Sequence, residues 1–159
     1  MPMRIGTEMP KLEGATEWAI GSQEEAERLK ETGPTLVHFW SVSCGLCKEN
    51  MPRVNELRET KRGQGLRVIA VHMPRYEADT NAEAIKEAIT KHNITEPCAI
   101  DNLHKLKDAF QNDHGYVPAY YLFDTEGKLK AFGAGEKGLN FVMPALERIL
   151  IQESKEVSV

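Results

Sequence analysis

The feature that most constrains the fold is an apolar run that ends shortly before a close pair of cysteines. Residues 35–40 read Thr-Leu-Val-His-Phe-Trp, a composition rich in β-branched, apolar and aromatic side chains. Following the turn residues Gly33-Pro34, such a run predicts a buried central strand. Cys44 and Cys47 come directly after it and open a stretch of helix formers. A strand that passes into a helix through a Cys-x-x-Cys segment is therefore expected.

The helix after the cysteine pair is expected to run to about residue 61. Met51, Val54 and Leu57 recur at helical spacing, which places them on one face toward the core. Pro52 lies inside the same segment and is expected to kink the helix, because proline has no N–H to donate.

Further apolar patterns predict a mixed central β-sheet flanked by helices on both faces, which is an α/β fold. Strand, helix and strand in succession make a parallel βαβ unit, and two strands around a four-residue turn make a hairpin. The other expected elements are an extended piece at 17–20, a helix at 23–31, a strand at 66–71, a helix at 82–92 capped by Asp79 or Thr80, an edge strand at 98–100, a helix at 102–111 capped by Asp101, hairpin strands at 119–123 and 128–132, and a helix at 139–152.

The length and composition predict one domain. A chain of 159 residues, 41% of them hydrophobic, can bury a core without disulfide bonds. Residues 1–33, which proline and glycine interrupt, are expected to form an N-terminal lead-in packed on the domain. The domain itself is expected over 34–153, and the polar tail 154–159 is expected to fray.

Charge and hydropathy exclude several kinds of partner. The formal net charge is -4, so neither nucleic acid nor an anionic membrane is an expected partner, and we expect a monomer. No apolar stretch approaches the roughly 18 residues of a membrane span, and the start of the chain lacks the apolar core of a secretory signal. We expect a cytoplasmic protein; the alternative is an extracytoplasmic one with a trimmed signal or anchor. No phosphate loop or ligand cluster is evident, so no cofactor and no metal is expected.

The spacing of Cys44 and Cys47 suits reversible disulfide chemistry. Positions i and i+3 of a first helical turn share a face, with Cα atoms near the roughly 5.5–6 Å that a disulfide prefers. Cys44 falls at the helix N-terminus, where free N–H groups and the helix dipole stabilise a thiolate, so it is the expected nucleophile. Cys47, one turn inside and more covered, is placed to attack a mixed disulfide and is the expected resolving thiol.

Three other readings of the cysteine pair stay open. A structural disulfide is opposed by the reducing compartment expected for this chain. A zinc site needs four ligands, and no second close pair of Cys or His is present. A chance Cys-x-x-Cys is common in proteins, but its position after a strand favours function.

The residues around the cysteines resemble those of a known family. Phe39-Trp40 followed by Ser-Val-Ser-Cys-Gly-Leu-Cys-Lys is similar to the active site of thioredoxins, and Pro52 falls where thioredoxins also have a proline. Val117-Pro118 resembles the cis-proline loop of the family. The lead-in, the hairpin and the stretch Ala-Val-His-Met-Pro-Arg-Tyr-Glu-Ala-Asp are most similar to the TlpA/ResA-like branch. The resemblance covers residues 9–150.

The resemblance implies a thioredoxin-like fold and thiol–disulfide exchange on disulfide-containing proteins, with thioredoxin reductase or another dithiol donor as electron source. It implies that His38, where thioredoxin has a buried aspartate, is the base that takes the Cys47 proton; the alternative is a hydrogen-bonded core histidine. The substrate-binding residues that it implies are Trp40, Gly45, Leu46, Val117 and Pro118. For Trp40 the alternative is that it only packs the core.

Two departures from the family limit what the resemblance implies. Leu46 stands where thioredoxin has proline, so the redox potential cannot be transferred, although we expect a reductant. Asn50 stands where ResA-like proteins have a glutamate, which argues against their specialised role in cytochrome c maturation. A peroxidase on the same fold is one alternative; a copper-delivery protein or a redox-dead interaction module is the other.

Cys98 and four of the histidines lie outside the expected site. Cys98 opens an edge strand and is expected to be an inert small hydrophobe, with a regulatory thiol as the alternative. The histidines show no ligand spacing and are expected to be solvated or to cap helices. They are His72, His92, His104 and His114.

Overall fold

The computed structural model describes residues 2–157, with side-chain surroundings for residues 2–152. Its centre is a six-stranded sheet in the order β1-β4-β3-β2-β5-β6. The strands are β1 Glu17–Ile20, β2 Thr35–Trp40, β3 Arg67–His72, β4 Cys98–Ile100, β5 Ala119–Phe123 and β6 Leu129–Ala134. The helices are α1 Gln23–Leu29, α2 Gly45–Thr60, α3 Ala82–Lys91, α4 Lys105–Ala109 and α5 Gly138–Val157, with short 3-10 turns η1 Arg62–Gln64 and η2 Glu77–Thr80.

The sheet is mixed, as the sequence predicted. Strand β2 pairs in parallel with β3, and β3 in parallel with β4. The remaining pairings, of β1 with β4, β2 with β5 and β5 with β6, are antiparallel. Because β2 is central, all six of its residues are buried, and its C-terminal end is a fixed point from which α2 begins.

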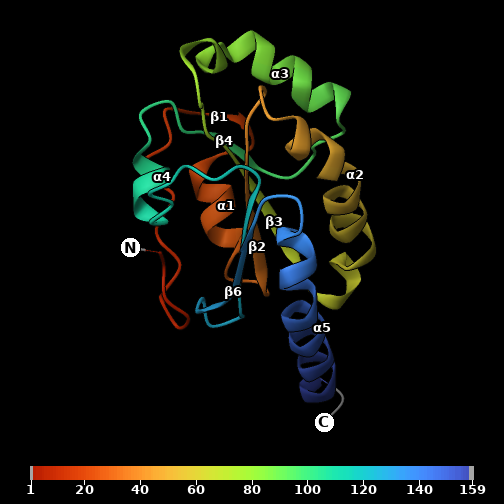
Figure 1. The fold of residues 1–159 in the computed structure, drawn as a ribbon. Helices are drawn as coiled ribbons and strands as arrows, with labels where there is room; N and C mark the ends of the chain where they lie inside the picture. The colour runs from red at the N-terminus through yellow and green to blue at the C-terminus, as the bar shows by residue number, and fades with distance from the viewer. Residues whose placement is uncertain (1, 158–159) are drawn as a thin grey trace.

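Helices cover both faces of the sheet, which confirms the predicted thioredoxin-like architecture. In Figure 1, α1 and α4 lie on one side of the strands, and α2 and α5 lie on the other. The alternation of β2 divides its side chains between these faces. Val37 packs in a core with Ala26 of α1 and Leu106 of α4, whereas Leu36 packs with Val54 of α2.

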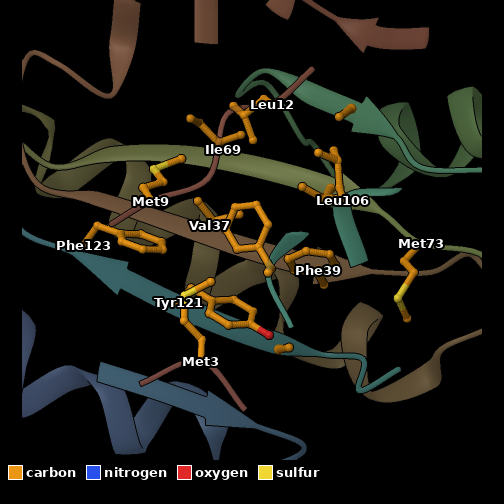
Figure 2. Close-up of a cluster of buried hydrophobic side chains, with 14 of the residues drawn as sticks. Met3, Met9, Leu12, Val37, Phe39, Ile69, Met73, Leu106, Tyr121 and Phe123 are labelled. Atoms are coloured by element: carbon orange, nitrogen blue, oxygen red, sulfur yellow. The ribbon is translucent and has the colours of Figure 1, made fainter. Parts of the chain in front are cut away.

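The N-terminal lead-in contributes to the first of these cores. Figure 2 shows Met9 and Leu12 lying over the sheet near Val37 and Ile69, and Leu12 is fully buried. These contacts support a lead-in packed on the domain, although the boundaries at residues 33 and 153 stay predictions. Burying a leucine side chain contributes roughly 1.5–3 kcal/mol, so the lead-in stabilises the fold.

Several helices differ from the sequence prediction at their ends, and α1 ends at Leu29 rather than at residue 31. Helix α4 begins at Lys105 rather than residue 102, because His104 takes a left-handed conformation with φ of 59°. Asp101 still accepts from the N–H groups of Leu106 and Lys107, both at 2.8 Å. The cap of α3 is Asn81, whose side chain accepts from Ala84, so the predicted caps Asp79 and Thr80 were wrong.

Helix α5 extends to Val157, beyond the predicted end at residue 152, and Pro144 lies inside it. The frayed tail expected at 154–159 stays a prediction, and residues 158–159 lie outside the described residues. Within the described part of the chain, no helix is both long and apolar enough to cross a membrane.

Candidate active site

A disulfide joins Cys44 and Cys47 where β2 gives way to α2, with the two Cα atoms 5.3 Å apart. Cys44 is the N-cap of α2, and its Sγ accepts a hydrogen bond from the N–H of Cys47 at 3.0 Å. The first sulfur therefore lies at the positive end of a 16-residue helix, where free N–H groups favour an anion. The structure thus brings the two predicted cysteines together in the predicted geometry.

The cysteines themselves are covered, and the residues between them are not. Cys44 is 3% exposed and Cys47 is 2% exposed, so in the oxidised state they are almost equally buried. Gly45 and Leu46 form the accessible part of the segment, and Leu46 is 39% exposed. A Cβ added at Gly45 would meet open space. Leu46 is therefore the exposed apolar side chain between the two buried cysteines.

The loop at Val117-Pro118 packs on the buried cluster that contains the two cysteines. The peptide bond between these residues is cis, Pro118 is buried, and the half-buried Val117 packs on the cluster that contains Cys44 and Cys47. The carbonyl of Pro118 accepts from the N–H of Gly135 at 2.9 Å, which ties the loop to the end of β6. Segments far apart in the sequence thus meet at one site.

Trp40 and Cys98 belong to the same buried cluster. Trp40 is 1% exposed and its ring meets the ring of His72 edge-on, with centroids 4.8 Å apart. Its predicted part in substrate binding is untested and stays a prediction. Burial raises the pKa of the Cys98 thiol to about 12. At neutral pH this thiol is protonated and a poor nucleophile, which agrees with an inert hydrophobe.

His38 is buried on the α2 face of the sheet and joins two charged residues that sequence reasoning missed. Its Nε2 lies 2.5 Å from Oε2 of Glu96, and Oε1 of Glu96 accepts from Nη1 of Arg58 at 2.6 Å. All three side chains are nearly inaccessible to solvent. Burial alone would raise the pKa of Glu96, but the hydrogen bond from His38 and the charge of Arg58 outweigh it and lower the pKa to about 2.

Local pattern carried only part of the signal for this triad. Arg58 follows Met51 by seven positions and Val54 by four, a spacing that puts it on the buried face of α2. Glu96 lies in the loop before β4, 58 residues from His38, and no local pattern points to that pairing.

The loop between β2 and α2 is held by Asp79. Its Oδ2 accepts from the hydroxyls of Ser41 at 2.9 Å and Ser43 at 2.7 Å, and from the N–H groups of Arg75 and Tyr76. Burial would raise the pKa of Asp79, but these hydrogen bonds lower it overall. Arg75 adds a bond from Nη2 to the carbonyl of Ser43 at 2.6 Å. The residue before Cys44 is therefore fixed by both its side chain and its backbone.

His72 supports the same loop from below, so the expectation that it is solvated or a cap was wrong. It is fully buried at the end of β3, and its Nε2 accepts the N–H of Val42 at 3.1 Å. Burial lowers the pKa of His72 to about 4, which keeps the imidazole neutral and able to accept. The burial of His72 could not be predicted from its position in the strand. Polar and apolar residues do not alternate in a strand when helices cover both faces of the sheet.

The fold and the cysteine site define a class: this chain is a thiol–disulfide oxidoreductase of thioredoxin-like fold. It belongs to the AhpC/TSA family, which matches residues 5–132. The thiol-disulfide oxidoreductase YkuV of Bacillus subtilis (strain 168) is 45% identical over 150 residues, covering 94% of this chain and 99% of YkuV. The thiol-disulfide oxidoreductase ResA of Bacillus anthracis is 30% identical over 135 residues, covering 85% of this chain and 72% of ResA.

Solved structures agree with these relatives. A thioredoxin-like protein in the oxidised form, solved in solution, is 44% identical, with a TM-score of 0.82 over 94% of this chain and 99% of that one. The thioredoxin domain of a thiol-disulfide oxidoreductase from Bacteroides vulgatus is 19% identical, with a TM-score of 0.67 over 93% of this chain and 99% of that one. The second likeness shows the fold alone. Together the comparisons confirm the resemblance to the ResA-like branch.

Proposed function

We propose that this protein reduces disulfides of protein substrates, with Cys44 as the attacking thiol and Cys47 as the resolving thiol. The observation that carries the proposal is the place of the Cys44 sulfur: it caps α2 and accepts the N–H of Cys47. A thiolate formed there is stabilised by the helix end, so it is available near neutral pH. The 45% identity to a thiol–disulfide oxidoreductase over nearly the whole chain supports the same chemistry.

The reaction proceeds in two exchange steps. The Cys44 thiolate attacks one sulfur of the substrate disulfide; a Cys44–substrate bond forms, the substrate S–S bond breaks, and the released sulfur takes a proton from water. Cys47 then loses its proton to a base and attacks Cys44 Sγ, and the second substrate sulfur leaves as a thiolate that is protonated by water. Two electrons pass to the substrate, and the Cys44–Cys47 disulfide remains.

His38 is the base proposed for the second step. It lies on the face of β2 that α2 covers, in the strand that leads to the cysteines. A neutral imidazole there accepts the proton of Cys47 and later releases it. The alternative is a core histidine that only forms a hydrogen bond with Glu96. In that case replacing His38 would not change the rate of the second step.

The substrate chain is proposed to bind across the exposed rim of the site. Leu46 and the half-buried Val117 supply apolar contact, and Gly45 leaves open space beside its Cα. The backbone of Val117 is the proposed partner of the substrate backbone, because the Pro118 carbonyl is already bonded to Gly135. Trp40 supports this surface from beneath. An extended segment of a disulfide-containing protein fits such a rim, since backbone groups give affinity without strict sequence preference.

The proposed setting is a cytoplasmic monomer recharged by thioredoxin reductase or another dithiol donor. The formal charge of -4 supports the absence of nucleic acid and anionic membrane partners. The dithiol itself carries the two electrons, so the proposal requires no cofactor and no metal.

Insulin-disulfide reduction with an external dithiol tests the proposal. The wild type is expected to accelerate it, and Cys44→Ser is expected to abolish the acceleration. A potential near about -270 mV for the dithiol supports a reductant, whereas a value near about -120 mV would indicate an oxidant. Faster consumption of peroxide than of insulin disulfide would favour the peroxidase alternative. Tight stoichiometric copper binding would favour copper delivery. A wild-type protein that neither reduces insulin disulfides nor consumes peroxide would indicate a redox-dead module.

A further inference from the structure

Three buried side chains, one from β2, one from the loop before β4 and one from α2, are joined by hydrogen bonds. They are His38, Glu96 and Arg58, linked by contacts of 2.5 Å and 2.6 Å. We propose that Glu96 is a positioning residue of the thiol–disulfide reaction: it fixes the His38 tautomer that carries its proton on Nε2, so that Nδ1 is the atom that accepts a proton. The inference rests on the proposed function of His38 as the base for Cys47.

The tautomer follows from which groups can donate. Arg58 Nη1 donates to Oε1 of Glu96, and a guanidinium has no acceptor, so the carboxylate is acceptor on that side. The low pKa of Glu96 keeps it ionised, so its second oxygen, Oε2, also only accepts. The 2.5 Å contact from Oε2 to His38 therefore requires a proton on Nε2. In a neutral imidazole the lone pair is then on Nδ1.

Arg58 balances the charge of Glu96 next to His38. One buried anion and one buried cation already balance, so the cluster is neutral while His38 is neutral. Arg58 is itself held by Asn55 Oδ1 at 2.7 Å and by the Asn93 carbonyl at 3.2 Å, which leaves the guanidinium little freedom. When His38 takes a proton, the carboxylate of Glu96 stabilises the imidazolium, as the buried aspartate of a Ser-His-Asp triad does for its histidine.

The far end of the triad meets an open groove. Glu96 and Arg58 line it together with the basic side chains of Arg62 and Arg67. The groove lies at the Glu96 and Arg58 end of the hydrogen-bonded chain, whereas His38 belongs to the strand that leads to the cysteines. Other titratable groups face the cluster from the neighbouring elements. Tyr120 of β5 pairs with His38 across the sheet, Cys98 of β4 interacts with Glu96, and Cys47 belongs to α2 above.

The nitrogen chemical shifts of His38 test the inference directly. In the wild type, 15N NMR is expected to show a protonated Nε2 and an unprotonated Nδ1; the reverse assignment would overturn the inference without any variant. In Glu96→Gln the tautomer is expected to reverse. Arg58 requires the amide oxygen of the glutamine, so the amide NH2 faces His38, and Nε2 must then accept.

The second readout is the resolving step of the reaction. Mixing the reduced protein with Ellman's disulfide releases two thionitrobenzoate ions, the first on attack by Cys44 and the second on attack by Cys47. Glu96→Gln is expected to slow the second release roughly tenfold to a hundredfold near pH 7 and to leave the first unchanged, because a misplaced general base loses most of its effect. The matched control is Glu59→Gln, which removes the exposed carboxylate on Arg58 that does not touch His38.

The outcomes separate this inference from the proposed function. If His38→Ala carries out the resolving step at the wild-type rate from pH 5 to 9, His38 is not the base, and this inference fails with it. The insulin assay tests the exchange activity independently of that result. If His38→Ala is slow but Glu96→Gln keeps both the wild-type tautomer and the wild-type second phase, Glu96 has no positioning role and the proposed function stands. An equal effect from Glu59→Gln would also overturn the role of Glu96.

Discussion

Leu46 is the exposed apolar side chain between the two buried cysteines, and it is proposed to contact the substrate. It is apolar and 39% exposed, while the cysteines on either side of its segment are covered. We predict that Leu46→Ser raises KM for insulin about threefold to tenfold and changes kcat little, because an apolar contact of roughly 1 kcal/mol made by substrate and transition state alike is lost. Steady-state insulin reduction measures both constants, and urea unfolding should show a stability change below about 0.5 kcal/mol.

Ile151 provides the control for this prediction, since it is an aliphatic residue of α5, 57% exposed. Ile151→Ser should leave KM at the wild-type value. A fall in kcat at constant KM for Leu46→Ser would show instead that the residue acts on the redox chemistry and not on binding.

Single residues differ in how well the sequence reveals them. Cys44 and Cys47 could be predicted because both the spacing and the helix start are local. Glu96 could not, because its partners His38 and Arg58 are 58 and 38 residues away in the chain. Burial of a charged group is decided by such distant partners and not by its neighbours.

At the level of elements, buried apolar strands were predicted closely, and helix ends were not. Strand β2 was predicted at its observed bounds, since an uninterrupted apolar run has few other solutions. The error at α3 has a physical cause: Asp79, a good capping residue, binds Ser41 and Ser43 instead, and Asn81 takes the cap. A side chain such as Asp79 can accept hydrogen bonds either from a helix N-terminus or from a distant loop. Tertiary contacts decide between the two, so the local sequence cannot.

The short turn η2 acts as a clamp on the active-site loop, through the four hydrogen bonds that Asp79 accepts. We predict that Asp79→Ala lowers the free energy of unfolding by about 2–3 kcal/mol, because the buried hydroxyl of Ser41 and three partly buried donors lose a charged acceptor. Amide exchange at Ser43 and Cys44 should also accelerate. Urea unfolding and hydrogen-exchange NMR measure the two effects.

Glu77 lies on the same turn and is exposed, so Glu77→Ala is the matched control for the clamp. It should change stability by less than about 0.5 kcal/mol and leave the loop amides protected. Equal losses in the two variants would mean that the turn matters and the carboxylate does not.

For the molecule as a whole, two buried groups make folding depend on pH in the same direction. Burial lowers the pKa of His72 from 6.5 to about 4. The contacts with His38 and Arg58 lower the pKa of Glu96 from 4.5 to about 2 against the opposing effect of burial. The unfolded chain therefore binds a proton at His72 between pH 6.5 and about 4 that the folded chain excludes, and a second at Glu96 between pH 4.5 and about 2. Stability must fall as the pH falls through both windows.

We predict that the free energy of unfolding declines as pH is lowered from about 6.5, with a contribution of up to about 1.4 kcal/mol per pH unit from His72. In His72→Gln, which keeps an acceptor for Val42 but does not titrate, the decline between pH 6.5 and 4 should be smaller, and the decline below pH 4.5 that belongs to Glu96 should remain. Urea unfolding at half-unit pH intervals measures both slopes. His114→Gln, which removes an exposed imidazole, should follow the wild type. Identical slopes for His72→Gln and the wild type above pH 4.5 would mean that His72 is not excluded from protonation by the fold, and that the neutral acceptor beneath the active-site loop has to be sought elsewhere.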